Sequence, residues 1–142
     1  MTKLYELLRH KFVWWALFVL WLMAIFYASS LTDQETRPYI PTFALHKLAH
    51  FVAYGSGGVI LALSLRFSTR WGWGKIAIVS IAVVSVYGAT DEFHQTFTPG
   101  RGPAARDWAI DTVSGAAWVG MLVALKGRLK RWIGVVLNSD IR

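Results

Sequence analysis

The stretch Phe12–Ala28, FVWWALFVLWLMAIFYA, contains no charged residue in 17 positions. Backbone groups in hydrocarbon must be hydrogen-bonded within their own segment, and a helix of about 17 to 25 apolar residues crosses a bilayer. The stretch therefore predicts a membrane-spanning α-helix near the start of the chain. Ala28-Ser29-Ser30 resembles a signal-peptide cleavage site, but the apolar run exceeds the roughly 7 to 15 residues of a signal peptide. We expect the helix to be retained.

The composition of the whole chain also indicates that its surface faces lipid. Of its 142 residues, 55% are hydrophobic and only 16% are charged. A water-soluble domain carries about 25% charged residues, so this chain has too few to cover a water-exposed surface. The chain has no cysteine, which excludes disulfides, thiolate metal ligands and a cysteine nucleophile.

Three further apolar runs have the length of helices, at residues 45–65, 76–95 and 108–125. A membrane barrel would need segments of about ten residues with alternating polarity, and the sequence has none. The sequence predicts an all-α polytopic membrane protein, a four-transmembrane-helix bundle that forms a single domain over residues 1–142. Its spans are expected at about 12–28, 45–65, 76–95 and 108–125.

The basic residues divide unevenly between the two sides of such a bundle. Eleven lie in the tails and the second connection, at Lys3, Arg9, Lys11, Arg66, Arg70, Lys75, Lys126, Arg128, Lys130, Arg131 and Arg142. Four lie on the other side, at Arg37, Lys47, Arg101 and Arg106. The positive-inside rule predicts a multi-pass protein of the cell membrane with both termini in the cytoplasm. The net charge of +7 is then a matter of topology, and no nucleic-acid partner is expected.

Tryptophans flank the predicted spans, as interfacial anchors do. Trp71, Trp73 and Trp132 fall on the cytoplasmic side and Trp108 on the outer side.

Polar residues concentrate at the ends of the spans that are predicted to face outward. His46, His50 and Tyr54 share one helix face because they are four residues apart. On the other spans, the corresponding residues are Asp91, Glu92, Gln95, Asp107 and Asp111. These faces are expected to converge.

The helix dipole predicts partners for some of these charges. Lys47 and His50 follow a helix N-terminus, whereas Asp91 and Glu92 precede a C-terminus, so each pair has the wrong sign for its own helix. We expect Lys47 or His50 to pair with Asp91 or Glu92. Asp107 is expected to be the N-cap of a helix that begins at Trp108.

The connection between the last two spans contains a turn. Thr98-Pro99-Gly100-Arg101 has proline and glycine at the central positions of a type II turn. Arg101 is expected to serve as an anion clamp or as the partner of Asp107 or Asp111. Gly55, Gly57 and Gly58 are expected to allow close helix contact, and His46 and His94 are expected to be exposed.

A metal site and a nucleophile are both disfavoured by the local sequence. His46 and His50 have the i, i+4 spacing of a zinc motif, but HKLAH lacks the glutamate of HExxH, and Lys47 would repel a cation. No nucleophile-elbow motif surrounds Ser56, Thr90 or Ser114. We expect no metal and no cofactor.

Two segments carry a resemblance to a known family. HKLAHFVAYGSGG (46–58) and YGATDEFHQTFTPGRGPAARDWAIDTVSGAAWVG (87–120) resemble the VanZ-like family. The matching positions are Lys47, His50, Tyr54, Asp91, Glu92, Gln95, Pro99, Arg101, Asp107 and Gly115. Asp111 departs from the pattern, which usually has asparagine there. The resemblance implies a small integral membrane protein whose namesake is associated with low-level resistance to teicoplanin, and it supplies no established reaction.

Two functions remain open. In the first, an outward-facing site binds or modifies an anionic envelope lipid or cell-wall precursor; whether it is an enzyme stays open. Glu92, Asp91 and His50 would be the acid–base groups, and the ligand-binding residues would be Lys47, Tyr54, Gln95, Arg101, Asp107 and Asp111. In the second, the protein shields the membrane surface from glycopeptide or assists assembly, and the polar cluster is a structural clasp. A third, ion-coupled carriage, has few spans unless the protein oligomerises, and its oligomeric state is open.

Overall fold

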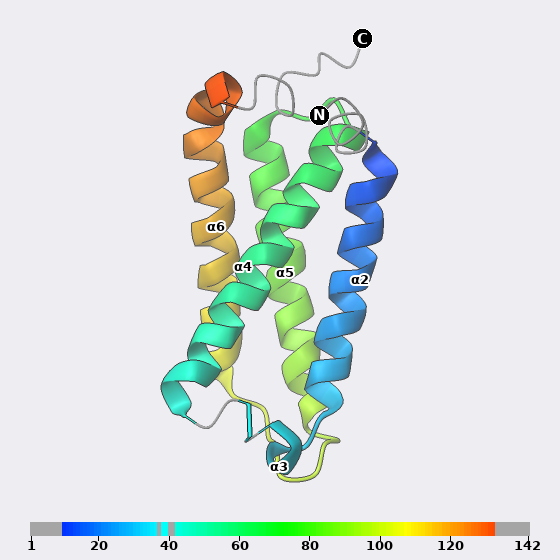
Figure 1. Ribbon diagram of the computed structural model, residues 1–142, viewed down its shortest axis with the longest axis vertical. Coiled ribbons are helices and arrows are strands. Elements are labelled where there is room, and N and C mark those ends of the chain that lie inside the picture. The colour runs from blue at the N-terminus through cyan, green and yellow to red at the C-terminus, as the bar shows by residue number, and fades with distance from the viewer. Residues whose placement is uncertain (1–9, 37, 40–41, 133–142) are drawn as a thin grey trace.

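The computed structural model describes residues 10–36, 38–39 and 42–132, with side chains as far as Lys126. The described residues form helices and connections without a strand (Figure 1), which confirms the all-α prediction. The helices are α2 (Lys11–Ser30), α3 (Asp33–Thr36), α4 (Phe43–Ser68), α5 (Trp73–Gln95) and α6 (Ala105–Trp132). Several predicted features lie outside the described residues and side chains: the basic residues of the tails other than Lys11 and Lys126, as well as Arg37 and the Trp132 indole.

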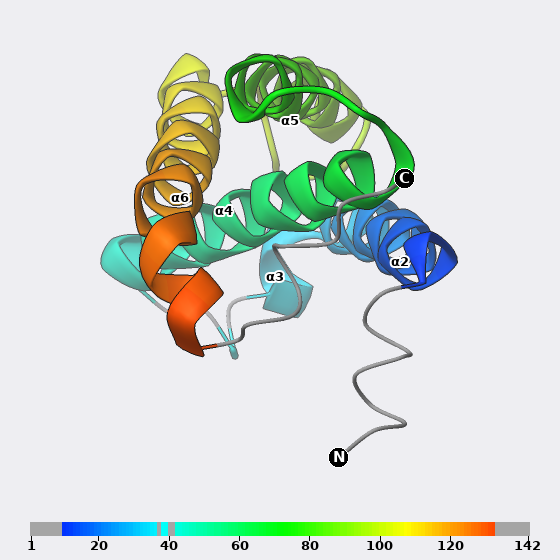
Figure 2. The ribbon, with the colours of Figure 1, turned by 90° about the horizontal axis from the view of Figure 1, so that it is seen from above.

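The four long helices pack as a bundle in which successive helices run in opposite directions and α4 is central (Figures 1 and 2). It packs against α6, α2 and α5, and most extensively against α6. Helices α4 and α6 run in the same direction, opposite to α2 and α5. As a result α4 and α6 both begin, and α2 and α5 both end, at the end of the bundle that carries α3. We name this the α3 end.

All four long helices are long and apolar enough to cross a membrane. Many large apolar side chains on their outer faces are exposed, among them Leu20, Met23, Ile78 and Val86. Such a surface suits hydrocarbon, where an apolar side chain has no reason to be buried. Between the helices lies a core cluster of Phe18, Trp21, Tyr54, Leu61, Ala62, Leu65, Ile76, Val84 and Val119.

Glycines set the close contact of α4 with its neighbours, as predicted. A Cβ atom on Gly58 would lie 3.0 Å from a Val119 methyl and 3.4 Å from the Gly115 Cα. One on Gly55 would lie 2.7 Å from the Trp118 indole. Because these glycines have no side chain, the α4 and α6 backbones approach closely at this point.

The short helix α3 was not predicted, although its sequence contains a recognisable start signal. Thr32 and Glu35 form a capping box, in which the Glu35 carboxylate accepts hydrogen bonds from the Thr32 hydroxyl (2.6 Å) and backbone N–H (2.8 Å). These bonds lower the pKa of Glu35 below its usual value. The box fixes the connection that leads from α2 towards α4.

Candidate functional site

Polar side chains from α4, α5 and α6 converge at the α3 end, as the sequence predicts. Seven of the nine predicted site residues are buried, and Lys47 and Arg101 are partly exposed. The buried residues are His50, Tyr54, Asp91, Glu92, Gln95, Asp107 and Asp111. So many buried ionisable groups in a membrane protein require partners or a function.

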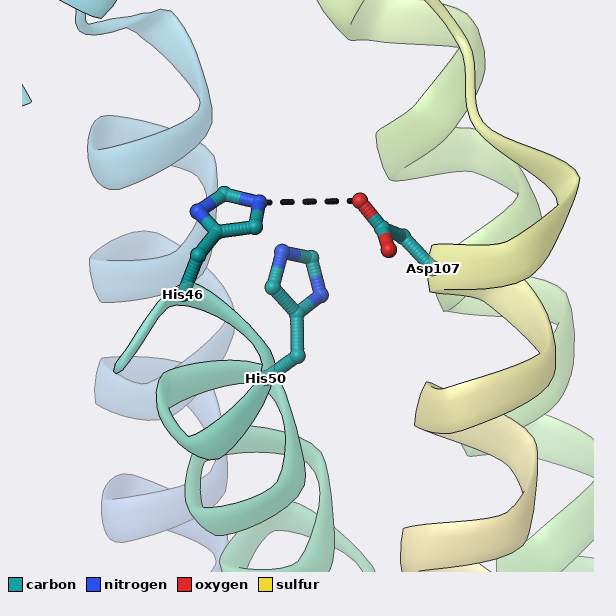
Figure 3. A group of neighbouring side chains, drawn as sticks. All are labelled: His46, His50 and Asp107. Carbon is teal, nitrogen blue, oxygen red and sulfur yellow. Dashed lines mark ion pairs between the residues drawn. The ribbon is translucent and has the colours of Figure 1, made fainter. Parts of the chain in front are cut away.

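Lys47 pairs with Asp107 on α6, and not with Asp91 or Glu92 as predicted. His46 also faces Asp107, with 3.5 Å between its Nε2 and Oδ2 (Figure 3). The prediction of the partner was wrong because it considered only α5. Helices α4 and α6 start at the same end and pack most closely, so their first turns lie side by side. A carboxylate in the first turn of α6 also has the favourable sign for that helix.

His50 likewise pairs with α6. Its Nδ1 lies 2.8 Å from Oδ1 of Asp111, a residue with no exposed surface. The imidazole stacks on Tyr54 with 6.0 Å between ring centroids. Gly88 of α5 makes room for this carboxylate, since a Cβ there would lie 3.2 Å from Oδ2. Asp111, the position at which the sequence departs from the family pattern, is therefore the partner of His50.

Glu92 caps α6 and does not pair with Lys47 or His50. Its Oε2 accepts a 2.6 Å hydrogen bond from the backbone N–H of Ala104, just before the helix begins. Asp107 is thus the third residue of α6 and not its N-cap, which corrects that prediction. The Glu92 carboxylate lies at the C-terminal, negative end of its own helix α5, but at the N-terminal, positive end of α6. Asp91 accepts a hydrogen bond from Gln95 Nε2 at 3.0 Å.

The predicted type II turn at residues 98–101 is present. Gly100 has φ +79°, and the Arg101 N–H donates to the Thr98 carbonyl at 3.1 Å. Arg101 does not pair with Asp107 or Asp111. Its Nη1 donates to the carbonyls at the end of α2, those of Ala28 (3.2 Å), Leu31 (3.3 Å) and Ser29 (3.5 Å). The Ala28 carbonyl also accepts a hydrogen bond from the Leu31 N–H at 3.3 Å, so the guanidinium adds donors to the C-terminal cap of α2.

A cavity of about 160 Å³ lies beside this cluster. Arg101, His50, Tyr54, Asp91 and Gln95 contribute to its wall. The remaining wall residues come from α2, α3 and α4: Ile25, Ala28, Ser29, Asp33, Thr36, His46, Ala49 and Ala53. A cavity of about 150 Å³ admits a molecule of the size of benzene, so this one has room for a small chemical group.

Several buried polar atoms around the cavity have no hydrogen-bond partner among the described residues. They include the hydroxyls of Ser29 and Tyr54, both in the cavity wall, and one carboxylate oxygen each of Glu92 and Asp111. Buried polar atoms are nearly always satisfied in folded proteins. Ser29 was not predicted as a site residue, because a serine in YASS at the end of an apolar helix carries no distinctive pattern.

His46 and His94, which were expected to be exposed, are both partly buried. The His46 side chain is 36% exposed but faces Asp107. His94 is half-buried, and its Nε2 lies 3.1 Å from the Ser30 hydroxyl on α2. His94 therefore joins α5 to α2 and lies outside the cluster.

Two groups of side chains have the donor atoms and spacing to hold a metal ion. One consists of His46, His50 and Asp107, which face each other between α4 and α6 in Figure 3. The other consists of His50, Glu92 and Asp111, all three buried. In each group the ligand atoms lie within 4.8 Å of one another. The sequence pattern showed only the His46–His50 spacing, because the carboxylates come from other helices.

Comparison with known proteins gives one match. The profile of a family described as VanZ/LLP1 matches residues 5–126. That range includes all four spans and every residue of the cluster. The search of curated proteins and the search of solved structures gave no match.

Proposed function

Since the chain belongs to the VanZ/LLP1 family and has four helices fit to span a membrane, we propose that its polar cluster is a binding site for an anionic head group. The ligand would be an envelope lipid or a lipid-linked cell-wall precursor at the outer face of the cell membrane. The wall of the cavity beside the cluster offers an anion the guanidinium of Arg101 and the hydroxyls of Ser29 and Tyr54, and it also contains the carboxylates of Asp33 and Asp91. The size of the cavity suits a phosphoryl group or a similar moiety.

Arg101 is the observation that carries the proposal. Among the residues that the structure describes, no carboxylate lies within ion-pair distance of its guanidinium, and the partners of its Nη1 are main-chain carbonyls. Carbonyls orient a guanidinium without neutralising its charge. Arginine presents a fork of donors that suits phosphate or carboxylate. A fixed, unneutralised cation in the wall of a small cavity supports an anionic ligand.

The hydroxyls of Ser29 and Tyr54 add to this wall. Both are buried without a partner among the described side and main chains, and both line the cavity. A ligand oxygen placed between them would accept the hydrogen bonds that they lack. Lys47, by contrast, is outside the wall and paired with Asp107, so its role is to hold that carboxylate and not the ligand.

A catalytic version of the proposal uses the same residues. His50 and Asp91 line the cavity, and Glu92 contacts the connection that precedes α6. Groups of this kind, placed next to a bound phosphoryl ester, would serve as general acid and base. The Glu92→Gln substitution retains an oxygen for the Ala104 N–H and removes the ionisable group, so it separates chemistry from helix capping.

The test is lipid binding by the purified protein in detergent. The wild type is expected to bind phosphatidylglycerol saturably and more tightly than phosphatidylcholine, as measured by native mass spectrometry. Arg101→Gln should weaken that preference at least about tenfold, since it removes a charge-assisted contact of about 1.5–3 kcal/mol. Arg106→Gln is the matched control, because Arg106 is exposed and not part of the wall. Equal affinity for both lipids in the wild type would contradict the proposal.

The alternative is that the cluster is a structural clasp in a protein that shields the surface from glycopeptide or assists assembly. The observation that favours it is the pairing within the bundle of Lys47 with Asp107 and of His50 with Asp111. In that case neither lipid binds saturably in the native mass spectrometry experiment. In a separate thermal unfolding measurement, Arg101→Gln lowers the unfolding temperature to the same extent with either lipid.

A further inference from the structure

The cluster of His50, Glu92 and Asp111 has properties that head-group binding does not require. The three residues come from α4, α5 and α6, and they are 8%, 5% and 0% exposed. Their ligand atoms lie within 4.8 Å of one another. From this arrangement we propose that His50, Glu92 and Asp111 bind one divalent metal ion of the zinc type.

The donor set suits such an ion. Imidazole nitrogen and carboxylate oxygen are both zinc ligands, and zinc sites with three protein ligands keep a fourth position open. Bonds of about 2.0–2.2 Å to a tetrahedral ion place its ligand atoms about 3.4 Å apart. The cluster therefore needs only small side-chain shifts. His50 also lines the cavity, which gives an ion a path to the site and a place for its fourth ligand.

Each of the two carboxylates, Glu92 and Asp111, has one oxygen with a polar partner and one without. The Glu92 carboxylate accepts from Ala104 through Oε2, and its Oε1 has no partner among the described residues. The Asp111 carboxylate contacts His50 through Oδ1, and its Oδ2 is likewise without one. In metal sites the ligands are oriented by hydrogen bonds to groups outside the metal's own shell, as the Ala104 N–H orients Glu92. Two buried, unpartnered anionic oxygens next to an imidazole are what a cation would complete.

The charge balance of the α3 end supports the same conclusion. Within the cluster, four buried carboxylates (Asp91, Glu92, Asp107 and Asp111) stand against two partly exposed cations (Lys47 and Arg101), a formal charge of −4 + 2 = −2; Arg106, at the same end, is exposed and lies outside the cluster. An unbalanced charge inside a membrane bundle is unfavourable. A divalent ion would balance it.

Lys47 no longer argues against a metal. In the sequence it lies next to both histidines, but the structure pairs its ammonium with Asp107. The repulsion it would exert on a bound cation is thus offset by that carboxylate. The same pairing makes His46–His50–Asp107 the weaker of the two candidate groups, because an ammonium already occupies its carboxylate.

The test is a zinc titration of the full-length protein in detergent, after treatment with EDTA and removal of the chelator. ZnCl₂ is the only ligand added, and calorimetry measures stoichiometry and affinity. The expected result is one zinc ion per chain, together with a higher unfolding temperature. Glu92→Gln and Asp111→Asn should each weaken binding at least about tenfold, since even outer-shell changes cost 10–100-fold. His94→Gln is the matched control and should bind as the wild type does.

Two results would overturn the assignment. One is the absence of stoichiometric zinc binding by the wild type. The other is loss of binding in His46→Gln with full binding in Glu92→Gln, which would place the ion with His46, His50 and Asp107. If Asp111→Asn fails to fold, the wild-type stoichiometry and Glu92→Gln still decide. No lipid head group is added to the titration, so its outcome is separate from that of the proposed function.

Discussion

Lys47 and Asp107 illustrate how a single pair holds two helices at the α3 end. The side chains are 19% and 9% exposed, so either one left alone would be a poorly solvated charge. Lys47→Met is expected to lower the free energy of unfolding by about 1–3 kcal/mol, the cost of an unpaired buried group. Lys47→Met with Asp107→Leu should recover most of that loss, since apolar residues often replace a buried ion pair without penalty.

Thermal unfolding in detergent, followed by circular dichroism, measures this pair. Arg106→Met serves as the control for loss of a positive charge at the same end, and its effect should stay within about 0.5 kcal/mol. A double variant no more stable than Lys47→Met would show that the pair is not the source of the effect.

At the residue scale, the sequence predicted which side chains gather but not which ones touch. Helical spacing, the opposition of charge to helix dipole and, for Arg101, the Pro-Gly turn placed nine residues at one end, and the structure brings them there. The partners differ because pairing depends on which helices are adjacent and parallel. That depends on glycine contacts between helices such as Gly58 with Gly115, which the pattern of charges does not indicate.

At the scale of the elements, the α4–α6 contact depends on those glycines. Gly58→Leu should lower the free energy of unfolding by about 1–3 kcal/mol, because an added side chain would overlap Val119 and push the backbones apart. Gly120→Leu is the matched control on α6, since nothing lies within 4 Å of a Cβ at that position. Denaturation in mixed micelles measures both, and equal losses in the two variants would contradict the role given to Gly58.

The helices themselves were largely predictable from apolar run length, and their ends were not. Helix α6 begins at Ala105, three residues before the predicted Trp108, because the carboxylate that caps it is Glu92 of α5. Such a cap is supplied from another element and leaves no trace in the local sequence. Helix α3 was missed although Thr32 and Glu35 are a capping box, since four residues give no periodicity.

At the scale of the whole molecule, the two ends of the bundle differ in the charged and aromatic side chains that they carry. At the end opposite α3, cations lie over indole rings, with Lys75 4.1 Å from the Trp71 ring and Lys126 5.9 Å from that of Trp73. Basic and aromatic side chains together are typical of a cytoplasmic interface. The α3 end holds all the carboxylates of the described residues, at Asp33, Glu35, Asp91, Glu92, Asp107 and Asp111. This asymmetry supports the predicted orientation, in which the α3 end faces outward.

The chain has no cysteine, so its orientation is readily measured with single introduced thiols. Gly102→Cys lies at the α3 end and Gly74→Cys at the opposite end, and both positions have open space for a side chain. A membrane-impermeant maleimide is expected to label Gly102→Cys in intact cells and Gly74→Cys only after lysis. The reverse pattern would invert the topology and place the polar cluster in the cytoplasmic half.

The attachment of α2 also sets an order of events during synthesis. The carbonyls at the end of α2 obtain their donors from Arg101, 73 residues later than Ala28, and the Thr98 hydroxyl reaches Ser29 across a similar separation. Helix α2 is therefore synthesised well before the residues that complete the hydrogen bonds at its C-terminal end. It acquires these hydrogen bonds only after the turn that follows α5 has been translated, so this end of the bundle assembles late.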